Sequence, residues 1–311
     1  MLIEKDIDLQ KSQVSWLRLE QEIPLELEDS FYWLLNNLKI HRFSFEHEPG
    51  NNFSQILFIW LPLNEWKIKD RDDLVQSFNS LAEPFELTLP VCKWVQVKDE
   101  DWSSTWKKSW KPDPVGKSIL ILPAWLDLPG KFSGRKIIRL DPGYAFGTGS
   151  HPSTRLCIEA LDNDPPVGKT IADLGCGSGI LSLTALKLGA NSTYAVDTDC
   201  LAISATKINA DLNDFPKHLL NVSLGSIEEL EVNIPKTKID LMLCNILAPV
   251  IKSLGPDFEK IIGHQGKVIL SGLLIAQIKE IQEFFLPLGW EVLETQTKDQ
   301  WALMALTRKL S

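Results

Sequence analysis

Residues 170–180 read T-I-A-D-L-G-C-G-S-G-I and carry the strongest fold signal in the chain. The first five form a short, mostly apolar run of strand length, and residues 180–188 repeat apolar side chains at helical spacing. Between them, Gly175 and Gly177 permit a tight turn and let the backbone approach a ligand closely. A strand, a glycine-rich turn and a helix in direct succession predict the first βα unit of a parallel sheet.

The same alternation of strand and helix continues from this unit towards the end of the chain. The last two apolar runs flank Lys298-Asp299 and predict an antiparallel hairpin. Alternation of this kind builds a mostly parallel sheet with helices on both faces. We therefore expect an α/β domain with a Rossmann-like, seven-stranded, mostly parallel sheet. The expected strands are residues 170–174, 193–197, 219–224, 240–245, 267–271, 290–297 and 301–308, and the expected helices are residues 180–188, 201–212, 246–262 and 273–285.

The first 98 residues show a different order of elements. Their pattern is strand, helix, strand, strand, helix, strand, which is the order of the split βαβ, ferredoxin-like α+β unit. The expected strands are residues 14–20, 41–48, 54–61 and 91–97, the expected helices are residues 27–38 and 70–85, and the turn is at residues 49–52. Units of this kind are often binding platforms, which is an analogy at the level of the fold.

A proline-rich connecting region follows the first domain, with little regular structure expected beyond the segments at residues 117–122 and 136–140. Trp102, Trp106 and Trp110 lie four residues apart, on one side of a predicted helix, where aromatic side chains usually serve packing. We expect residues 1–98 to form the ferredoxin-like domain, 99–140 a linker with this tryptophan-bearing helix, and 141–311 the main α/β domain.

The overall composition is that of a globular protein with a net charge of −9 and 44% hydrophobic residues. Residues 1–98 hold 10 Lys+Arg and 16 Asp+Glu, a balance of −6. An acidic domain argues against a phosphate-backbone partner and is compatible with a basic protein partner, although a solvated acidic surface explains the charge equally well.

Several classes of protein are disfavoured by the sequence. No apolar run approaches the roughly 20 residues that span a bilayer, and acids near the N-terminus disfavour a secretory signal. The five cysteines are scattered, without the spacing of a metal site or a disulfide framework. We expect a cytoplasmic protein without a membrane partner or a bound metal.

The glycine-rich turn is predicted to bind a cofactor. A dinucleotide fingerprint needs a third glycine where this chain has Ile180, because Gly179 comes one residue early. Asp173 would also place a negative charge near a pyrophosphate. The carboxylate instead suits a ligand with a sulfonium and an ammonium group. Asp173, Gly175 and Gly177 are therefore candidate cofactor residues, and a nicotinamide dehydrogenase is disfavoured.

A second candidate lies at the end of the next predicted strand. Asp197 follows Gly175 by 22 residues, the spacing at which an acid typically accepts hydrogen bonds from ribose hydroxyls. One of the two acids in V-D-T-D could instead cap the following helix, and Asp199 fits that cap better. Asp197 is thus the predicted ribose ligand.

A third candidate, Asn245, ends the fourth predicted strand. Ligands of open parallel sheets bind at this edge, and the amide carbonyl could accept a hydrogen bond from a substrate amine or from the amino-acid part of a cofactor. The alternative is a helix cap. Methyltransferases that act on bases often have Asn-Pro-Pro-aromatic here, whereas this chain has Asn-Ile-Leu-Ala and lacks that stacking residue. Direct reading of nucleic acid is therefore not expected.

Residues 141–154 precede the sheet and read D-P-G-Y-A-F-G-T-G-S-H-P-S-T. Glycines around Phe146 and Thr148 predict a mobile loop that could close over a ligand. His151 is a candidate base, but a histidine before a proline serves at least as often as a structural hydrogen-bonding residue. No other candidate base is apparent, so we expect no dedicated base.

These motifs together resemble the bacterial ribosomal protein L eleven methyltransferase family. The resemblance rests on residues 141–154, on D-L-G-C-G-S-G-I-L, V-D-T-D and N-I-L-A, and on the linker segment, and it is weakest over residues 1–90. It implies a class I methyltransferase domain that uses S-adenosylmethionine, and an N-terminal domain for substrate recognition. It also implies methylation of lysine side chains and of the N-terminal α-amine on a large-subunit ribosomal protein. The cofactor contacts carried over by position are Thr154, Gly175, Asp197 and Asn245, with Phe146 beside them.

Other functions stay open at this level. A class I methyltransferase could act on a different protein, a small-molecule amine or a base. A catalytically silent binding module is the alternative outside the enzymes, but a damaged glycine turn or a missing acid would mark it, and neither is seen.

Overall fold

The computed structural model describes residues 15–24, 27–40, 42–46, 54–85, 87–98, 110–141, 149–235 and 239–308. The chain forms two compact units, Met1–Trp110 and Lys111–Ser311. The predicted turn at residues 49–52, Trp102 and Trp106 lie outside the described residues.

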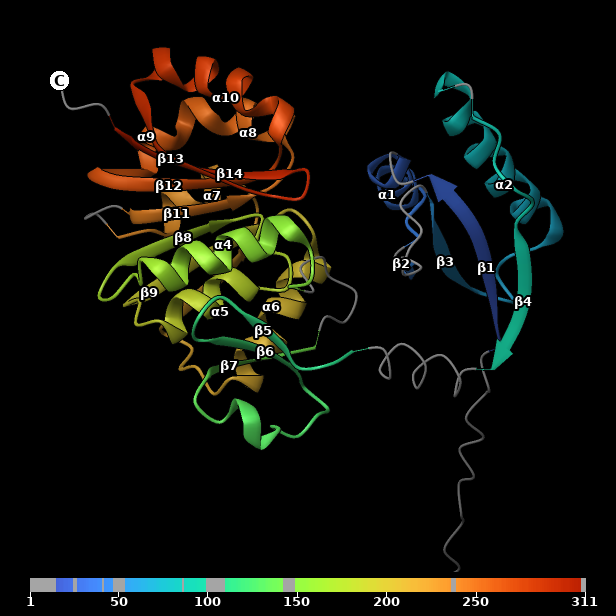
Figure 1. The fold of residues 1–311 in the computed structure, drawn as a ribbon, viewed down its shortest axis with the longest axis horizontal. Helices are drawn as coiled ribbons and strands as arrows, with labels where there is room; N and C mark the ends of the chain where they lie inside the picture. Colours follow the sequence, from blue (N-terminus) through green and yellow to red (C-terminus); the bar gives the residue numbers. More distant parts are fainter. Residues whose placement is uncertain are drawn as a thin grey trace, which may run out of the picture. The chain divides into compact units, whose positions relative to one another are not determined.

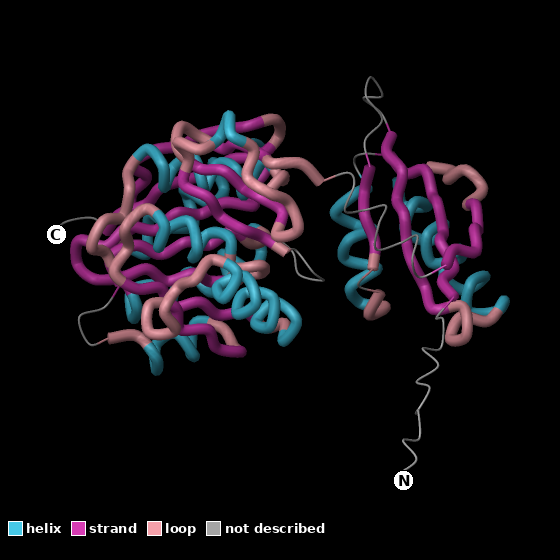
Figure 2. Tube along the Cα trace, turned by 90° about the horizontal axis from the view of Figure 1, so that it is seen from below, coloured by secondary structure: helices cyan, strands magenta, loops and turns pink. Residues whose placement is uncertain are grey.

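Unit 1 contains a four-stranded antiparallel sheet with the order β2-β3-β1-β4 (Figures 1 and 2). Strand β3 alternates half-buried and buried side chains, because one face of the sheet packs against the helices. Phe31 and Phe78 come from the two helices and meet edge to face in this core, with ring centroids 5.0 Å apart. The elements are β1 (Ser15–Pro24), α1 (Glu28–Asn37), β2 (Phe43–Glu46), β3 (Ser54–Pro62), α2 (Ile68–Ala82) and β4 (Lys93–Lys98), with a 3-10 turn η2 (Glu83–Phe85) after α2.

The main sheet of unit 2 has the strand order β10-β9-β8-β11-β12-β14-β13 (Figure 1). The first five strands are parallel, and β14 is antiparallel to both of its neighbours. The strands are β8 (Thr170–Leu174), β9 (Ser192–Asp197), β10 (Leu220–Leu224), β11 (Ile239–Asn245), β12 (Ile262–Leu274), β13 (Trp290–Lys298) and β14 (Trp301–Arg308). The predicted hairpin turn is confirmed, with Asp299 in a left-handed conformation.

The helices of unit 2 alternate with these strands. They are α4 (Pro152–Asn163), α5 (Ile180–Lys187), α6 (Cys200–Leu212), α7 (Ile227–Asn233), α8 (Ala248–Leu254), α9 (Phe258–Ile261) and α10 (Ile278–Phe285), with 3-10 turns η3 (Gly130–Phe132), η4 (Gly255–Asp257), η5 (Ile275–Gln277) and η6 (Leu286–Leu288). On β11, Met242 and Cys244 share one core with residues of α8, α9 and α10. A central parallel strand is buried on both faces, which explains its nearly continuous apolar run.

Several predicted boundaries differ from the structure. The helix predicted at residues 246–262 is divided into α8, η4 and α9, because Pro256 follows Gly255 and cannot continue a helix. The strand predicted at residues 267–271 is longer at both ends. Helices α4 and α7 were not predicted.

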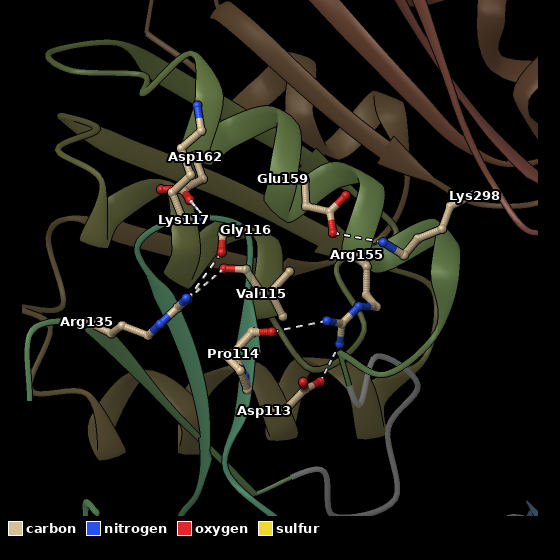
Figure 3. Close-up of polar contacts among 10 residues, drawn as sticks. All are labelled: Asp113, Pro114, Val115, Gly116, Lys117, Arg135, Arg155, Glu159, Asp162 and Lys298. Carbon is tan, nitrogen blue, oxygen red and sulfur yellow. Dashed lines mark hydrogen bonds and ion pairs between the residues drawn. The ribbon is translucent and has the colours of Figure 1, made fainter. Parts of the chain in front are cut away.

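Residues 113–140, assigned to a linker from the sequence, form a small sheet within unit 2. Its strands are β5 (Asp113–Val115), β6 (Ile119–Pro123) and β7 (Lys136–Leu140). Figure 3 shows Arg155 and Asp162 of α4 reaching residues around β5 and the turn that follows it. The polar partners lie about 40 residues further along the chain. The local pattern predicted regular structure at residues 117–122 and 136–140, where β6 and β7 lie, but it predicted neither β5 nor the pairing of the three strands.

The order of strands reverses between β8 and β11. Chain order runs outward from β8 through β9 to β10 on one side, and β11 begins the other side. In open parallel sheets, such a reversal separates the adjoining loops and opens a crevice at the carboxyl ends of the strands. The fold thus places the candidate site at this edge. No helix in the described part of the chain is long and apolar enough to cross a membrane.

Candidate active site

Three predicted site residues end or follow the strands next to this reversal. Gly175 follows β8, Asp197 ends β9 and Asn245 ends β11. These three strands are neighbours and run parallel, so their carboxyl ends share one edge (Figure 1). The structure therefore brings the three residues to the same edge of the sheet.

The glycine-rich turn is set by backbone conformation and by space. Gly175 and Gly179 have φ of 79°, in the left-handed region that side chains disfavour. A Cβ on Gly175 would lie 2.5 Å from Cγ2 of Ile246. The amides of Gly175 and Cys176 both donate to the carbonyl of Val196, at 2.9 and 3.0 Å. The turn is thus pinned to the end of β9 and packs closely against the residue after Asn245.

Asp197 is held in place by two backbone amides. Its Oδ2 accepts from the amide of Gly177 at 2.9 Å, and its Oδ1 accepts from the amide of Asp199 at 3.0 Å. The side chain is partly exposed, and each carboxylate oxygen has a further lone pair for a ligand hydroxyl. Asp199 caps α6 by accepting from the amide of Leu201 at 2.8 Å, so the prediction that Asp199 is the helix cap is confirmed.

Asp173 lies behind the turn and is 1% exposed. Its Oδ2 accepts from the amide of Ser182 at 3.1 Å and from the hydroxyl of Ser182 at 2.6 Å. Burial raises the pKa of Asp173 to about 6, the Ser182 hydrogen bonds oppose this rise, and the charge of Asp197 adds to it. Asp173 thus ties β8 to α5 and holds a titratable charge beneath the crevice.

Asn245 meets Thr154, the predicted site residue on α4. The Asn245 side-chain nitrogen donates to Thr154 Oγ1 at 3.2 Å, and Thr154 is 1% exposed. The alternative that Asn245 caps a helix does not hold, because the N-cap of α8 is Leu247 and has no side-chain cap. The carboxamide therefore links the end of β11 to the first turn of α4.

His151 has a structural place at the start of α4. It is the N-cap residue, and its Nδ1 accepts from the amide of Ser153 at 3.3 Å and lies 2.7 Å from the hydroxyl of Ser153. The ring contacts Trp301 edge to face, with centroids 4.5 Å apart. Burial lowers the pKa of His151, which favours the neutral ring that the cap requires. Phe146, the remaining predicted contact, lies outside the described residues.

Sequence reasoning missed the polar residues of α6 that support the turn. Thr206 donates to the carbonyl of Gly177 at 2.9 Å, and Asn209 donates to the carbonyl of Ser178 at 2.9 Å. Both side chains are fully buried. Their signal was available: two polar residues three positions apart on the apolar face of a predicted helix need partners.

The charges and thiols of the site do not indicate a metal centre. No group of three His, Cys, Asp or Glu residues able to hold an ion occurs in the described ranges. Cys157, Cys176 and Cys244 are buried free thiols. Burial raises the pKa of each, that of Cys157 to about 12, so these residues stay protonated in the core.

Three features together define a class I methyltransferase: a mostly parallel α/β sheet whose strand order reverses between β8 and β11, a glycine-rich turn after β8, and an acid at the end of β9. The family model described as ribosomal protein L11 methyltransferase (PrmA) matches residues 16–309. The chain belongs to this family, as its motifs predicted, and it is an enzyme, a methyltransferase.

Close relatives cover nearly the whole chain. A ribosomal protein L11 methyltransferase of Parasynechococcus marenigrum is 50% identical over 92% of this chain and 99% of that protein. One from Prochlorococcus marinus is 47% identical over 96% of this chain and 99% of its own length. Among solved structures, a ribosomal protein L11 methylase from Lactobacillus delbrueckii subsp. bulgaricus matches with a TM-score of 0.59 and 30% identity. It covers 65% of this chain and 100% of that chain.

Proposed function

We propose that this enzyme transfers methyl groups from S-adenosylmethionine to lysine side chains and to the N-terminal α-amine of ribosomal protein L11. The relatives' names support the substrate. The observation that carries the proposal is the Asp197 carboxylate, which Gly177 and Asp199 hold beside the glycine turn. A preorganised carboxylate at this edge suits a ribose with two free hydroxyls.

The residues present fit S-adenosylmethionine better than a dinucleotide. Gly175 has no side chain to exclude an adenosyl group, and the buried Asp173 is an unfavourable neighbour for a pyrophosphate. We assign the ribose of S-adenosylmethionine to Asp197. We assign its amino-acid part, and the side of the crevice on which the methyl group reacts, to Asn245 and Thr154. We retain Gly177 as a backbone contact and Phe146 as an expected contact from the loop.

When bound, S-adenosylmethionine supplies an electrophilic methyl group on a positively charged sulfur. Methyl transfer is an in-line displacement, so the protein's task is to align a neutral amine behind that carbon. A lysine amine begins with a pKa near 10.4, and desolvation in the crevice lowers that pKa. We propose that solvent takes the proton and that Asn245 orients the reacting groups. His151 is assigned no proton transfer, because its Nδ1 accepts the cap hydrogen bond.

We propose that residues 1–98 form a ferredoxin-like substrate-recognition domain and that residues 141–311 carry the methyltransferase site. The sheet order β2-β3-β1-β4 and the two helices of unit 1 support this assignment. The balance of −6 over residues 1–98 suits a basic ribosomal protein rather than a direct nucleic-acid partner. For such a substrate we propose a cytoplasmic enzyme.

Mass spectrometry of purified ribosomal protein L11 tests the proposal. After incubation with the enzyme and S-adenosylmethionine, we expect added methyl groups on lysines and on the N-terminal amine. The Asp197→Ala variant, tested in parallel, should leave the protein unmodified. An unmodified L11 after incubation with wild-type enzyme, together with a labelled small amine or another labelled protein in a cell extract, would contradict the proposed substrate.

A further inference from the structure

An irregularity in strand β12 lies directly beside Asn245. The antiparallel pairing of β12 with β14 is regular up to Leu270, opposite Met304, and resumes at Leu273, opposite Ala302. Two residues, Ser271 and Gly272, therefore face a single residue of β14, which is the arrangement of a β-bulge. On its other side, Ser271 is the register partner of Asn245 in β11.

The first bulge residue, Ser271, connects the strand to helix α4. Its side chain is fully buried, and its hydroxyl lies 3.0 Å from the carbonyl of Ser153 and 3.4 Å from the carbonyl of Ala302. Ser153 directly precedes Thr154, which accepts the hydrogen bond of Asn245. These contacts form a closed ring. Asn245 pairs with Ser271 in the sheet, Ser271 contacts the carbonyl of Ser153, and the next residue, Thr154, accepts the hydrogen bond of Asn245.

The second bulge residue, Gly272, lets the backbone of β12 pass close to the Ile246–Leu247 peptide, one residue beyond Asn245. Its φ is +77°, and a Cβ built on it would lie 2.6 Å from the carbonyl oxygen of Ile246 and 3.2 Å from Oδ1 of Asn245. Backbone atoms at 2.6 Å have to move, since no flexible side chain is there to yield. Any side chain at this position therefore displaces the Ile246–Leu247 peptide and crowds the Asn245 carboxamide.

We propose that Ser271 and Gly272 are positioning residues for methyl transfer. The bulge fixes the carboxamide of Asn245 and the first turn of α4 relative to each other, without contact between the bulge side chains and the substrate. This inference rests on the proposed role of Asn245. Since displacements near 1 Å lower rates by roughly 100-fold in preorganised sites, a small shift of the Asn245 carboxamide is enough to matter.

The test compares Gly272→Ala with Gly289→Ala in the full-length enzyme. Gly289 has φ of +80° with nothing within 4 Å of a built Cβ, so both variants carry the same kind of backbone strain. Only Gly272→Ala presses on the Ile246 carbonyl and on the Asn245 side chain. We expect kcat on ribosomal protein L11 to fall roughly 10- to 100-fold in Gly272→Ala. In Gly289→Ala it should stay within about twofold of wild type.

A cofactor titration separates positioning from general damage. Because Asp197 holds the ribose from β9, which does not pair with β12, we expect the Kd for S-adenosylmethionine in Gly272→Ala to rise by no more than about threefold. Ser271→Ala adds no atoms, and we expect thermal unfolding to show that its fold is intact. It should lower kcat by about 3- to 10-fold, again with little change in Kd.

Asn245→Ala serves as the reference for interpreting both variants. If Asn245→Ala lowers kcat while both bulge variants match wild type, the positioning role is wrong and the proposed function stands. If Gly272→Ala and Gly289→Ala both show a lower kcat and a weaker affinity for S-adenosylmethionine, backbone strain explains the effect, and this result would also overturn the inference. If Asn245→Ala itself keeps full kcat, the assignment of Asn245 fails first, and the inference fails with it.

Discussion

The side-chain amide of Asn245 donates a hydrogen bond to the hydroxyl of Thr154 across 3.2 Å, although the two residues are 91 positions apart in the chain. One residue ends a central strand and the other lies in the first turn of α4. The contact joins the motif at residues 141–154, before the main sheet, to the motif Asn-Ile-Leu-Ala at the end of β11. The site therefore exists only when the folded sheet brings these two segments together.

Replacing Asp197 should abolish high-affinity binding of S-adenosylmethionine. A carboxylate that accepts two ribose hydroxyls makes charge-assisted hydrogen bonds worth about 1.5–3 kcal/mol each. We expect Asp197→Ala to raise the Kd by roughly 100-fold or more in a calorimetric titration. As control, Asp199→Ser removes a neighbouring charge and keeps an oxygen that caps α6, so its Kd should stay close to wild type. Normal affinity in Asp197→Ala would rule out the ribose assignment.

Asp173 should make the enzyme less stable as the pH rises through about 6. Its pKa is raised from 3.8 to about 6, so the folded state holds a proton that the unfolded state releases. The associated stability is complete below pH 4 and is lost as the pH rises through about 6. At 1.36 kcal/mol per pKa unit, the loss is about 3 kcal/mol.

Denaturant unfolding at several pH values checks this linkage. The difference in unfolding free energy between wild type and Asp173→Asn should fall by about that amount from pH 4 to pH 7. Asparagine keeps an acceptor for Ser182, so the comparison isolates the charge. Parallel curves for the two proteins would show that Asp173 does not titrate in this range.

Replacing His151 should affect stability more than catalysis. His151→Ala removes the acceptor that caps α4, at a cost of about 1 kcal/mol. We expect kcat to stay within about threefold of wild type, since the proton of the amine goes to solvent. His151→Asn restores a cap acceptor and should recover most of the lost stability in thermal unfolding. A kcat that falls by orders of magnitude in both variants would instead identify His151 as a base.

Asp162 should be a stability determinant of unit 2. It accepts a hydrogen bond from the amide of Lys117 at 2.6 Å (Figure 3). It also accepts from the amide of Ser118 at 2.8 Å and from the Ser118 hydroxyl, and together these bonds fix the turn between β5 and β6. Burial raises its pKa, but these hydrogen bonds outweigh burial and leave the pKa lowered. Its contribution is therefore present above the ordinary carboxyl pKa and is lost as the pH falls through the lowered value.

Chemical denaturation of two variants at the C-terminal end of α4 measures the contribution of Asp162 to stability. Asp162→Ala leaves two amides without their acceptor and should lower the unfolding free energy by about 1–3 kcal/mol. Asp164→Ala removes an exposed ion pair with Lys267 and should cost less than about 1 kcal/mol. Equal losses in the two variants would mean that the hydrogen bonds to the turn add nothing.

The local parts of the site were predictable from the sequence. Gly175 and Asp197 follow apolar strands at a spacing that one βαβ unit dictates, and Asp199 carries a common cap signal. Helix α4 was not predicted, since its N-cap is a histidine and its start is merged with a glycine-rich loop. The contact of Thr154 with Asn245 and the bulge beside it depend on strand order, which residue patterns do not encode locally.

The burial of Asp173 could also not be predicted from the sequence. Its position after an apolar strand correctly suggested a carboxylate near the turn, but not that Ser182 would enclose it at 1% exposure. The segments of β6 and β7 were expected to be regular, but their joining with β5 in one small sheet was not predicted. Its stabilising partners, such as Asn213 for Arg139, come from a helix 74 residues away.

A crystal structure of the enzyme soaked with S-adenosylhomocysteine tests the central claim most directly. The account predicts both ribose hydroxyls within hydrogen-bonding distance of the Asp197 carboxylate, the adenosyl group over Gly175, and the sulfur on the side of Asn245. Electron density for the ligand at any other place, or a crevice that stays empty at saturating ligand, would contradict it.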